Sequence, residues 1–398
     1  MRYRAGMSTQ FKAVHGAMQA WVDGGILAGA SCALLSGGAV VDSHCAGWAD
    51  KEAGTALRED HLFRVFSNTK LVTSIAALQL VEQGRLGLDE PVESYLPALG
   101  GRRVLRAGAT RLDDSEPARR SITARHLLCH SAGLSYGFLD PGSLIYQAYT
   151  ARRVMHADSS LEGLIAALAP LPLTFHPGEQ WEYSIASDVL ARLVEVASGQ
   201  RFDRYLAQAI FAPLGMADTC FVIPPDKHGL LTAYYAGASR NDPTVPGLRR
   251  LAGSPYPGAY LAPVARYSGG GGLVSSLPDM AALLRSLMPG APCALLRPDT
   301  VAAMMRNQLP PGVRIGFPTV GAVPGKGFGL GGAVILQPGA DDPPASAGEF
   351  EWGGIAGTQW WINPRHNIAG VLMAQRQMGF WHPYTFEFKR LAYQALLA

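Results

Sequence analysis

Strand-forming segments lie at both ends of this 398-residue chain and are scarce in its middle. Near the N-terminus, apolar stretches at Ile26–Leu35 and Ala39–Ala46 flank Gly37-Gly38, which predicts a hairpin buried on both faces. Segments close to one another in a sheet need not be close in sequence, so one antiparallel sheet built from both chain ends is expected. The C-terminal strands are predicted at Phe328–Leu336, Phe350–Trp352, Thr358–Ile362 and Ile368–Ala374.

Helices are predicted around this sheet and throughout the middle of the chain. Phe11, Val14, Met18 and Trp21 recur at helical spacing before the hairpin, and Tyr384–Leu397 closes the chain as a second helix. We therefore predict an α+β fold, with an antiparallel sheet flanked by helices and a mostly helical second domain inserted. The predicted domains are a discontinuous one at 1–90 and 265–398 and an inserted one at 91–264.

Composition excludes several classes of protein. Lys and Arg total 34 against 31 for Asp and Glu, so no nucleic-acid partner is implied, and an apolar fraction of 48% with 16% charged residues excludes disorder. The five cysteines are scattered and the histidines lack metal-binding spacing, so we expect neither disulfides, metal nor cofactor. The apolar stretch 24–41 is split by two glycines, which argues against a membrane span. A cytoplasmic location is expected, and the oligomeric state remains open.

The pattern Ser67-Asn-Thr-Lys70 begins a predicted helix that extends from Ser67 to Gln83, with Leu71, Ile75, Leu78 and Val81 on an apolar face. A spacing of three places the hydroxyl and the amine on one side of the first turn. A lysine desolvated by apolar walls has a lowered pKa and acts as a base for serine. Alone, the same pattern also fits a helix-capping serine beside a solvated lysine.

Two later motifs, Tyr183-Ser-Ile185 and Trp352-Gly-Gly354, follow in the order typical of one superfamily. Together with the stretches 126–134 (His-Leu-Leu-Cys-His-Ser-Ala-Gly-Leu) and 213–216 (Pro-Leu-Gly-Met), they resemble the serine β-lactamase and penicillin-binding proteins. Within that superfamily the motifs are similar to those of the family VIII carboxylesterases, which have the class C β-lactamase fold.

The resemblance implies a role for each residue of these motifs. Ser67 would be the nucleophile, with Lys70 and Tyr183 as its base pair, and either of the two would accept the hydroxyl proton. The backbone N–H groups of Ser67 and Ile355 would form the oxyanion hole. The implied substrate-binding residues are Tyr136, Ile185, Trp352, Gly353 and Gly354, the two glycines allowing the strand to approach the substrate.

Two departures from the β-lactamase pattern bear on the substrate. Trp352 stands where a lysine or histidine would bind an anionic substrate, and Ile185 stands where an asparagine would bind an amide. We therefore predict an enzyme, a carboxylesterase that cleaves short- to medium-chain esters of small molecules through an acyl-enzyme on Ser67. If another residue such as Arg376 supplied the missing cation, a β-lactamase would be favoured instead.

The sequence is also compatible with other functions and with another nucleophile. An amidase, D-aminopeptidase or acyltransferase would use the same serine, and a non-catalytic binding protein would retain the fold. A rival nucleophile is Ser135, because Gly133-Leu-Ser-Tyr-Gly137 matches the nucleophile elbow of α/β-hydrolases. That elbow joins a strand to a helix, whereas the residues before Ser135 are predicted to be helical, so Ser67 is favoured.

Overall fold

A computed structural model describes residues 9–398 except 138, 240–241, 254, 257 and 319–320. Residues 1–8 of the predicted first domain thus lie outside the described part. The helices are α1 (Lys12–Asp23), α2 (Thr69–Glu82), α3 (Ala124–Leu128), α4 (Leu144–Ala151), α5 (Leu161–Leu168), α6 (Ala186–Ser198), α7 (Phe202–Leu206), α8 (Ala212–Leu214), α9 (Leu277–Ser286), α10 (Pro298–Met304) and α11 (Pro383–Leu396).

The strands are short except at the centre of the main sheet. They are β1 (Gly29–Ser36), β2 (Ala39–Asp50), β3 (Thr55–Ala56), β4 (Phe63–Arg64), β5 (Arg103–Leu105), β6 (Ser115–Pro117), β7 (Tyr235–Gly237), β8 (Leu248–Arg250), β9 (Val274–Ser275), β10 (Gly316–Phe317), β11 (Gly321–Ala322), β12 (Lys326–Phe328), β13 (Ala333–Ile335), β14 (Phe350–Gly353), β15 (Gln359–Asn363) and β16 (Ile368–Ala374).

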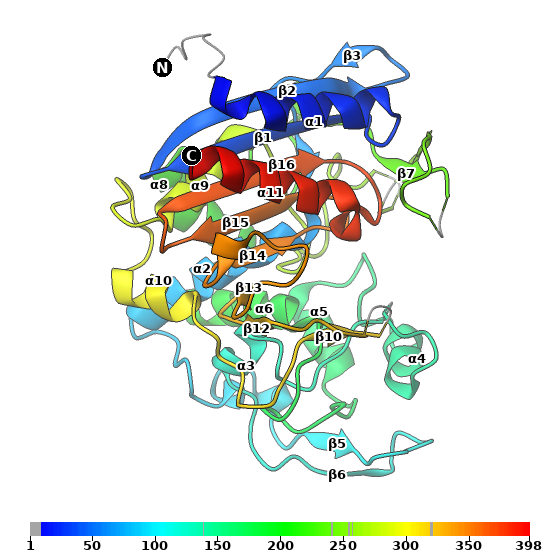
Figure 1. The fold of residues 1–398 in the computed structure, drawn as a ribbon. Helices are drawn as coiled ribbons and strands as arrows, with labels where there is room; N and C mark the ends of the chain where they lie inside the picture. The colour runs from blue at the N-terminus through cyan, green and yellow to red at the C-terminus, as the bar shows by residue number, and fades with distance from the viewer. Residues whose placement is uncertain (1–8, 138, 240–241, 254, 257, 319–320) are drawn as a thin grey trace.

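The main sheet joins the two ends of the chain, as predicted. Its order is β12-β13-β14-β15-β16-β1-β2-β3, and all its paired strands are antiparallel. The ends meet where β1 pairs with β16, with Cys32 opposite Leu372 (Figure 1). The predicted α+β class with an antiparallel sheet flanked by helices is thereby confirmed.

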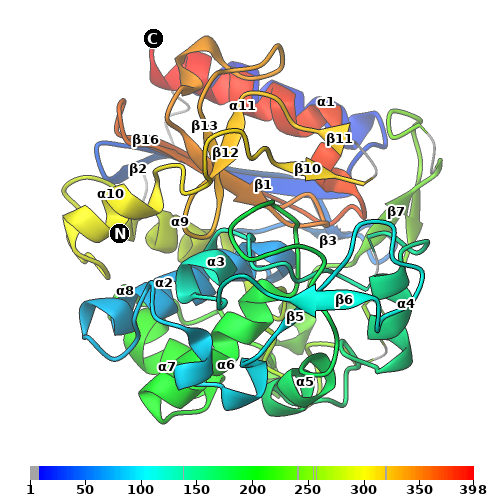
Figure 2. The ribbon, with the colours of Figure 1, turned by 90° about the horizontal axis from the view of Figure 1, so that it is seen from below.

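Helices cover both faces of the sheet. The terminal helices α1 and α11 lie side by side on one face (Figures 1 and 2). There Met18 and Phe388 pack on Leu34 and Leu372 in a separate hydrophobic cluster. The opposite face packs against α9 and, beyond it, the helices of the middle of the chain. The N- and C-terminal helices therefore cover the same face of the sheet that the two chain ends build.

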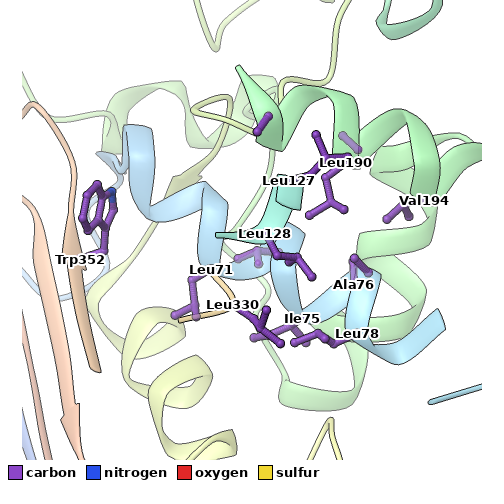
Figure 3. Close-up of a cluster of buried hydrophobic side chains, with 14 of the residues drawn as sticks. Leu71, Ile75, Ala76, Leu78, Leu127, Leu128, Leu190, Val194, Leu330 and Trp352 are labelled. Atoms are coloured by element: carbon purple, nitrogen blue, oxygen red, sulfur yellow. The ribbon is translucent and has the colours of Figure 1, made fainter. Parts of the chain in front are cut away.

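Helix α2 is not amphipathic, contrary to the prediction of one apolar face. Every residue from Thr69 to Leu80 is buried, because α2 passes through the interior between the sheet and α6. Figure 3 shows Leu71, Ile75 and Leu78 of this helix among side chains from α3 and α6. A helix buried on all sides needs apolar or small residues all round, which explains the alanines and threonines between the leucines.

Two strand predictions need correction. The segment Phe328–Leu336 is not one strand but the hairpin β12–β13, because the glycines at 329, 331 and 332 turn the chain; Gly331 has a φ of +110°. The second strand of the N-terminal hairpin, β2, is not buried on both faces: it lies near the sheet edge and exposes Val41 and Trp48. The middle of the chain, mostly helical, also contains the two-stranded pairs β5–β6 and β7–β8.

Candidate active site

Ser67 lies at the end of a strained turn that leads into α2. A single 3₁₀ turn, Phe66–Asn68, precedes the helix, and Phe66 has a φ of +42°. Non-glycine residues rarely adopt this conformation, and such strain tends to gather at functional sites. The backbone there is held in place by the β4–β9 pair and by the Val65 N–H, which donates to the Leu273 carbonyl at 3.2 Å.

Lys70 follows one helical turn later and reaches the serine. Its Nζ lies 3.2 Å from Ser67 Oγ and donates a second hydrogen bond of 2.7 Å to the Gly270 carbonyl. The side chain is fully enclosed, with Nζ 4.6 Å from the ring centroid of Tyr183 and 5.5 Å from that of Tyr136. The i, i+3 spacing therefore brings hydroxyl and amine together as the sequence predicts.

Tyr183 completes the group from a different part of the chain. It lies just before α6, and its hydroxyl donates a 2.7 Å hydrogen bond to Ser67 Oγ. The 116 residues between Ser67 and Tyr183 are bridged because α6 packs directly against α2. Ser67, Lys70 and Tyr183 thus form one hydrogen-bonded cluster at the N-terminal ends of two packed helices.

The pKa of Lys70 is raised, whereas the sequence analysis expects burial to lower it. Burial alone lowers the pKa of Lys70, but the adjacent hydroxyl groups of Tyr136 and Tyr183 outweigh burial and hold that pKa above its usual value. A raised pKa favours the ammonium form of Lys70, which donates both of its hydrogen bonds. The shift depends on Tyr136 and Tyr183, and the sequence does not reveal that these tyrosines lie next to Lys70.

Trp352 borders the cluster as predicted, but with a polar contact as well as an apolar one. Its indole N–H donates a 3.4 Å hydrogen bond to the Tyr183 hydroxyl, and its ring lies 5.3 Å from the Tyr183 ring. Tyr136 is on the other side, with its ring centroid 5.3 Å from that of Tyr183. Tyr183 is thus held between two aromatic side chains.

The two glycines after Trp352 allow close approach of the protein to itself. A Cβ at Gly353 would lie 2.7 Å from the Phe380 ring, and one at Gly354 would lie 2.5 Å from the Val65 carbonyl oxygen. The end of β14 therefore abuts the backbone just before Ser67. Ile355, the next residue, is 37% exposed and directly follows the glycine that approaches the Val65 carbonyl.

Ile185 does not contribute an accessible apolar surface. It is completely buried in the main hydrophobic core, and its N–H donates a 3.2 Å hydrogen bond to the Ser135 carbonyl. Its effect on substrate is thus limited to the absence of an asparagine amide at this position.

Ser135 is not placed as a nucleophile would be. It lies in a loop after α3, not between a strand and a helix, and its N–H donates to the Tyr149 hydroxyl at 3.3 Å. Its side chain is buried beside the Glu182 carboxyl group; burial raises the pKa of that group, and the Ser135 hydroxyl opposes the rise.

Arg376 is also unsuited to bind an anionic substrate. The guanidinium is 3% exposed and donates to the backbone carbonyls of Ile26 and Pro243, at 2.5 and 2.7 Å. Its two hydrogen bonds connect the loop before β8, at Pro243, to the segment before β1, at Ile26.

The structure adds an aromatic wall of the site, around Phe317, that the sequence analysis does not predict. Phe317, on the short strand β10, packs against Tyr183 at 5.8 Å and Trp352 at 6.4 Å between ring centroids, and reaches Trp381 at 5.4 Å. These aromatic residues come from four distant segments, so no local pattern marks them. Beside them lies a cavity of about 50 Å³, lined in part by Ile315, Phe317, Val323, Trp352, Phe380 and Trp381.

Two findings on metal binding and membrane spans concern the part of the chain that the structure describes. No group of three or more His, Cys, Asp or Glu side chains is arranged there to hold a metal ion. No helix within the described residues is both long enough and apolar enough to cross a bilayer.

The family is shown by comparison with known proteins. A family model described as "Beta-lactamase" matches residues 14–393. The chain belongs to the β-lactamase family. Esterase EstB of Burkholderia gladioli is 32% identical over 358 residues, which cover 87% of this chain and 86% of that protein. This confirms the predicted grouping with family VIII-type carboxylesterases and the prediction that the protein is an enzyme.

Two further relatives of this β-lactamase-family protein are described with acyltransferase activity. The solved structure of EstCE1, described as a hydrolase with promiscuous acyltransferase activity, superposes with a TM-score of 0.80 at 26% identity and covers 96% of this chain and 98% of its own. Monacolin J acid methylbutanoyltransferase of Aspergillus terreus is 32% identical over 337 residues, covering 80% of this chain and 78% of that protein.

Proposed function

We propose that this protein is a serine esterase that cleaves short- to medium-chain carboxylic esters through an acyl-enzyme on Ser67. The observation that carries the proposal is the convergence of two proton-bearing side chains on one hydroxyl: Lys70 Nζ at 3.2 Å and Tyr183 OH at 2.7 Å from Ser67 Oγ. A serine needs such a partner to become nucleophilic.

The charge state of Lys70 supports Tyr183 as the proton acceptor. An ammonium ion has no lone pair to accept a proton, so Lys70 acts by stabilising the Tyr183 phenolate, whose ring it faces at 4.6 Å. Once Tyr183 has released its own proton to solvent, its phenolate takes the Ser67 proton as Oγ attacks the ester carbonyl, and the resulting phenol returns that proton to the leaving alcohol. Water then attacks the acyl-enzyme in the same way, and the acid is released.

The oxyanion of each tetrahedral intermediate needs donors near Ser67. We assign this role to the backbone N–H groups of Ser67 and Ile355. Support comes from the approach of Gly354 to Val65, which brings the end of β14 beside the serine turn.

The substrate class follows from the walls of the site. Phe317, Trp352 and Trp381 form an apolar surface. Roughly 10–15 Å³ of cavity volume accommodates one water-sized group, so the cavity of about 50 Å³ admits about three to five carbon atoms. The two lysines that line this cavity, Lys326 and Lys389, are both paired with Glu351. An uncharged ester with a short acyl or alcohol chain fits these surroundings better than an anionic β-lactam.

Acyl transfer is the second candidate, favoured by the relatives that are named as transferases. It differs only in the last step, in which an alcohol replaces water. Both candidates require Ser67 as the acyl carrier.

The test combines covalent labelling with a substrate panel. A fluorophosphonate probe followed by peptide mass spectrometry should label the peptide that contains Ser67, and Ser67→Ala should abolish labelling and ester cleavage. Labelling at Ser135 would refute the proposal. Adding a small alcohol to the assay and measuring the ratio of new ester to free acid separates transfer from hydrolysis.

A further inference from the structure

Asp188 is a buried carboxylate that the proposed chemistry does not use. It lies in the first turn of α6 and is 3% exposed. Its Oδ1 atom has no hydrogen-bond partner among the residues that the structure describes. A buried carboxylate oxygen without a partner costs free energy, and such groups often have a catalytic role.

The carboxylate faces the glycine that binds Lys70. A Cβ added at Gly270 would lie 2.7 Å from Asp188 Oδ2 and 3.1 Å from the Tyr136 hydroxyl oxygen. The carbonyl of the same glycine accepts the 2.7 Å hydrogen bond from Lys70 Nζ. Asp188, Tyr136 and Lys70 therefore surround one backbone position at which a side chain does not fit.

Tyr136 lies between the two charged groups. Its phenol is buried, and burial, together with the nearby Tyr183 and Asp188, raises the pKa of Tyr136, so it stays neutral. A neutral hydroxyl has one proton and two lone pairs. Because the lone pairs are attracted to the Lys70 ammonium, the proton is best directed towards the Asp188 carboxylate.

The other ionisable groups around Asp188 do not compensate its charge. Burial lowers the pKa of His130, as does Lys70 close by, so its imidazole is neutral. On α6 itself, Arg192 pairs with Glu195 at 2.9 Å and with Glu162 of α5 at 3.6 Å. Within the described residues, Lys70 is thus the cation that Asp188 balances across Tyr136.

We propose that Asp188 is a positioning residue for the reaction: it orients the Tyr136 hydroxyl so that its lone pairs hold Lys70 as an ammonium ion beside Ser67 and Tyr183. This inference rests on the proposed esterase function. It adds a residue that touches neither the substrate nor Ser67, and it explains why a carboxylate is buried behind the nucleophile.

The test is the pH dependence of kcat/KM for p-nitrophenyl butyrate. Asp188→Asn keeps the shape but removes the negative charge, which lowers the pKa of every neighbouring group. Both limbs of the pH profile should therefore move to lower pH, by about one unit for a charge lost several ångströms away. Glu162→Gln, which removes an exposed carboxylate that pairs with α6, is the matched control and should leave both limbs in place.

A second comparison tests the route through Tyr136. In a Tyr136→Phe background, Asp188→Asn should shift the profile by a smaller amount, because the direct effect of the lost charge remains while the part transmitted through the oriented hydroxyl is gone. If Asp188→Asn does not fold, Tyr136→Phe alone decides, since it should move the alkaline limb to lower pH.

Two results would overturn the inference. One is a pH profile of Asp188→Asn in which the plateau of kcat/KM falls but neither limb shifts, which is the signature of a purely structural role. The other is an equal shift with and without Tyr136. Fluorophosphonate labelling of Ser67 in Asp188→Asn keeps the two proposals apart: labelling with an unshifted profile rejects the role of Asp188 and leaves the esterase proposal standing.

Discussion

The indole N–H of Trp352 donates a hydrogen bond to the hydroxyl of Tyr183 at 3.4 Å, and the same hydroxyl contacts Ser67 Oγ at 2.7 Å. Trp352 is therefore tied to the proposed proton acceptor as well as forming an apolar wall. An N–H that points at a phenol oxygen stabilises that oxygen when it carries negative charge.

This contact predicts the effect of Trp352→Phe. The variant keeps an aromatic wall but loses the donor, so kcat for p-nitrophenyl butyrate should fall about 10-fold, equivalent to roughly 1.4 kcal/mol, with a smaller change in KM. Trp48→Phe, at an exposed position on β2, is the control. An unchanged kcat in Trp352→Phe would show that the indole acts only as a wall.

Lys70 and Tyr183 should behave as one unit. Lys70→Ala and Tyr183→Phe should each lower kcat/KM by on the order of 10³-fold or more, and the double variant should lose little beyond either single one. The reason is that the Tyr183 phenolate cannot act as the base without the Lys70 ammonium that stabilises it. A double-mutant cycle in steady-state kinetics measures this, and additive losses would contradict a shared proton.

Neutral esters should be preferred over β-lactams. The ratio of kcat/KM for p-nitrophenyl butyrate to that for nitrocefin should be at least about 10², because a charge-assisted bond to a substrate carboxylate, worth roughly 1.5–3 kcal/mol, is missing. Trp352→Lys should lower ester turnover and narrow this ratio. Nitrocefin hydrolysis as fast as ester hydrolysis would favour a β-lactamase instead.

The cavity beside Trp352 should set the preferred chain length. Val323→Phe adds a ring to the cavity lining, so it should lower kcat/KM for p-nitrophenyl hexanoate by about 10-fold relative to p-nitrophenyl acetate. Leu336→Ala, at an exposed position after β13, should leave this ratio unchanged. Equal losses of kcat/KM for the two substrates would show that the acyl chain binds outside this cavity.

Stability should depend on pH through Glu349, which lies in a buried cluster with Glu351 and Lys389 behind the sheet. Burial raises the pKa of Glu349 to about 8, although Lys389 opposes this. A carboxyl whose pKa is higher in the folded state stabilises the fold while protonated. This contribution is complete below about pH 4.5 and is lost as pH rises through about 8.

The free energy of unfolding should therefore decrease between pH 5 and pH 8, by on the order of 2–4 kcal/mol. Glu349→Gln cannot ionise, so its curve should be flatter over that range in denaturant titrations. The exposed Glu162→Gln should follow the wild-type curve. A wild-type curve that rises with pH would mean that Lys389 keeps Glu349 ionised.

Local patterns determined much of the fold because they reflect single elements. The Gly37-Gly38 turn, the strand-forming segments at 350–374 and the helix that begins near Ser67 each depend on neighbours in sequence. The spacing of Ser67 and Lys70 placed the two groups within 3.2 Å for the same reason. The order of three short motifs identified the family because each motif lies in a local turn or strand end.

Tertiary packing decided what depends on residues far apart in the chain. The sequence cannot reveal that α2 is enclosed on every side, that Phe317 borders Tyr183, or that Arg376 is already bound by two backbone carbonyls. The charge of Lys70 is the clearest case. Burial by itself favours the neutral amine, and only the hydroxyl groups of Tyr136 and Tyr183, brought in from distant loops, reverse that preference.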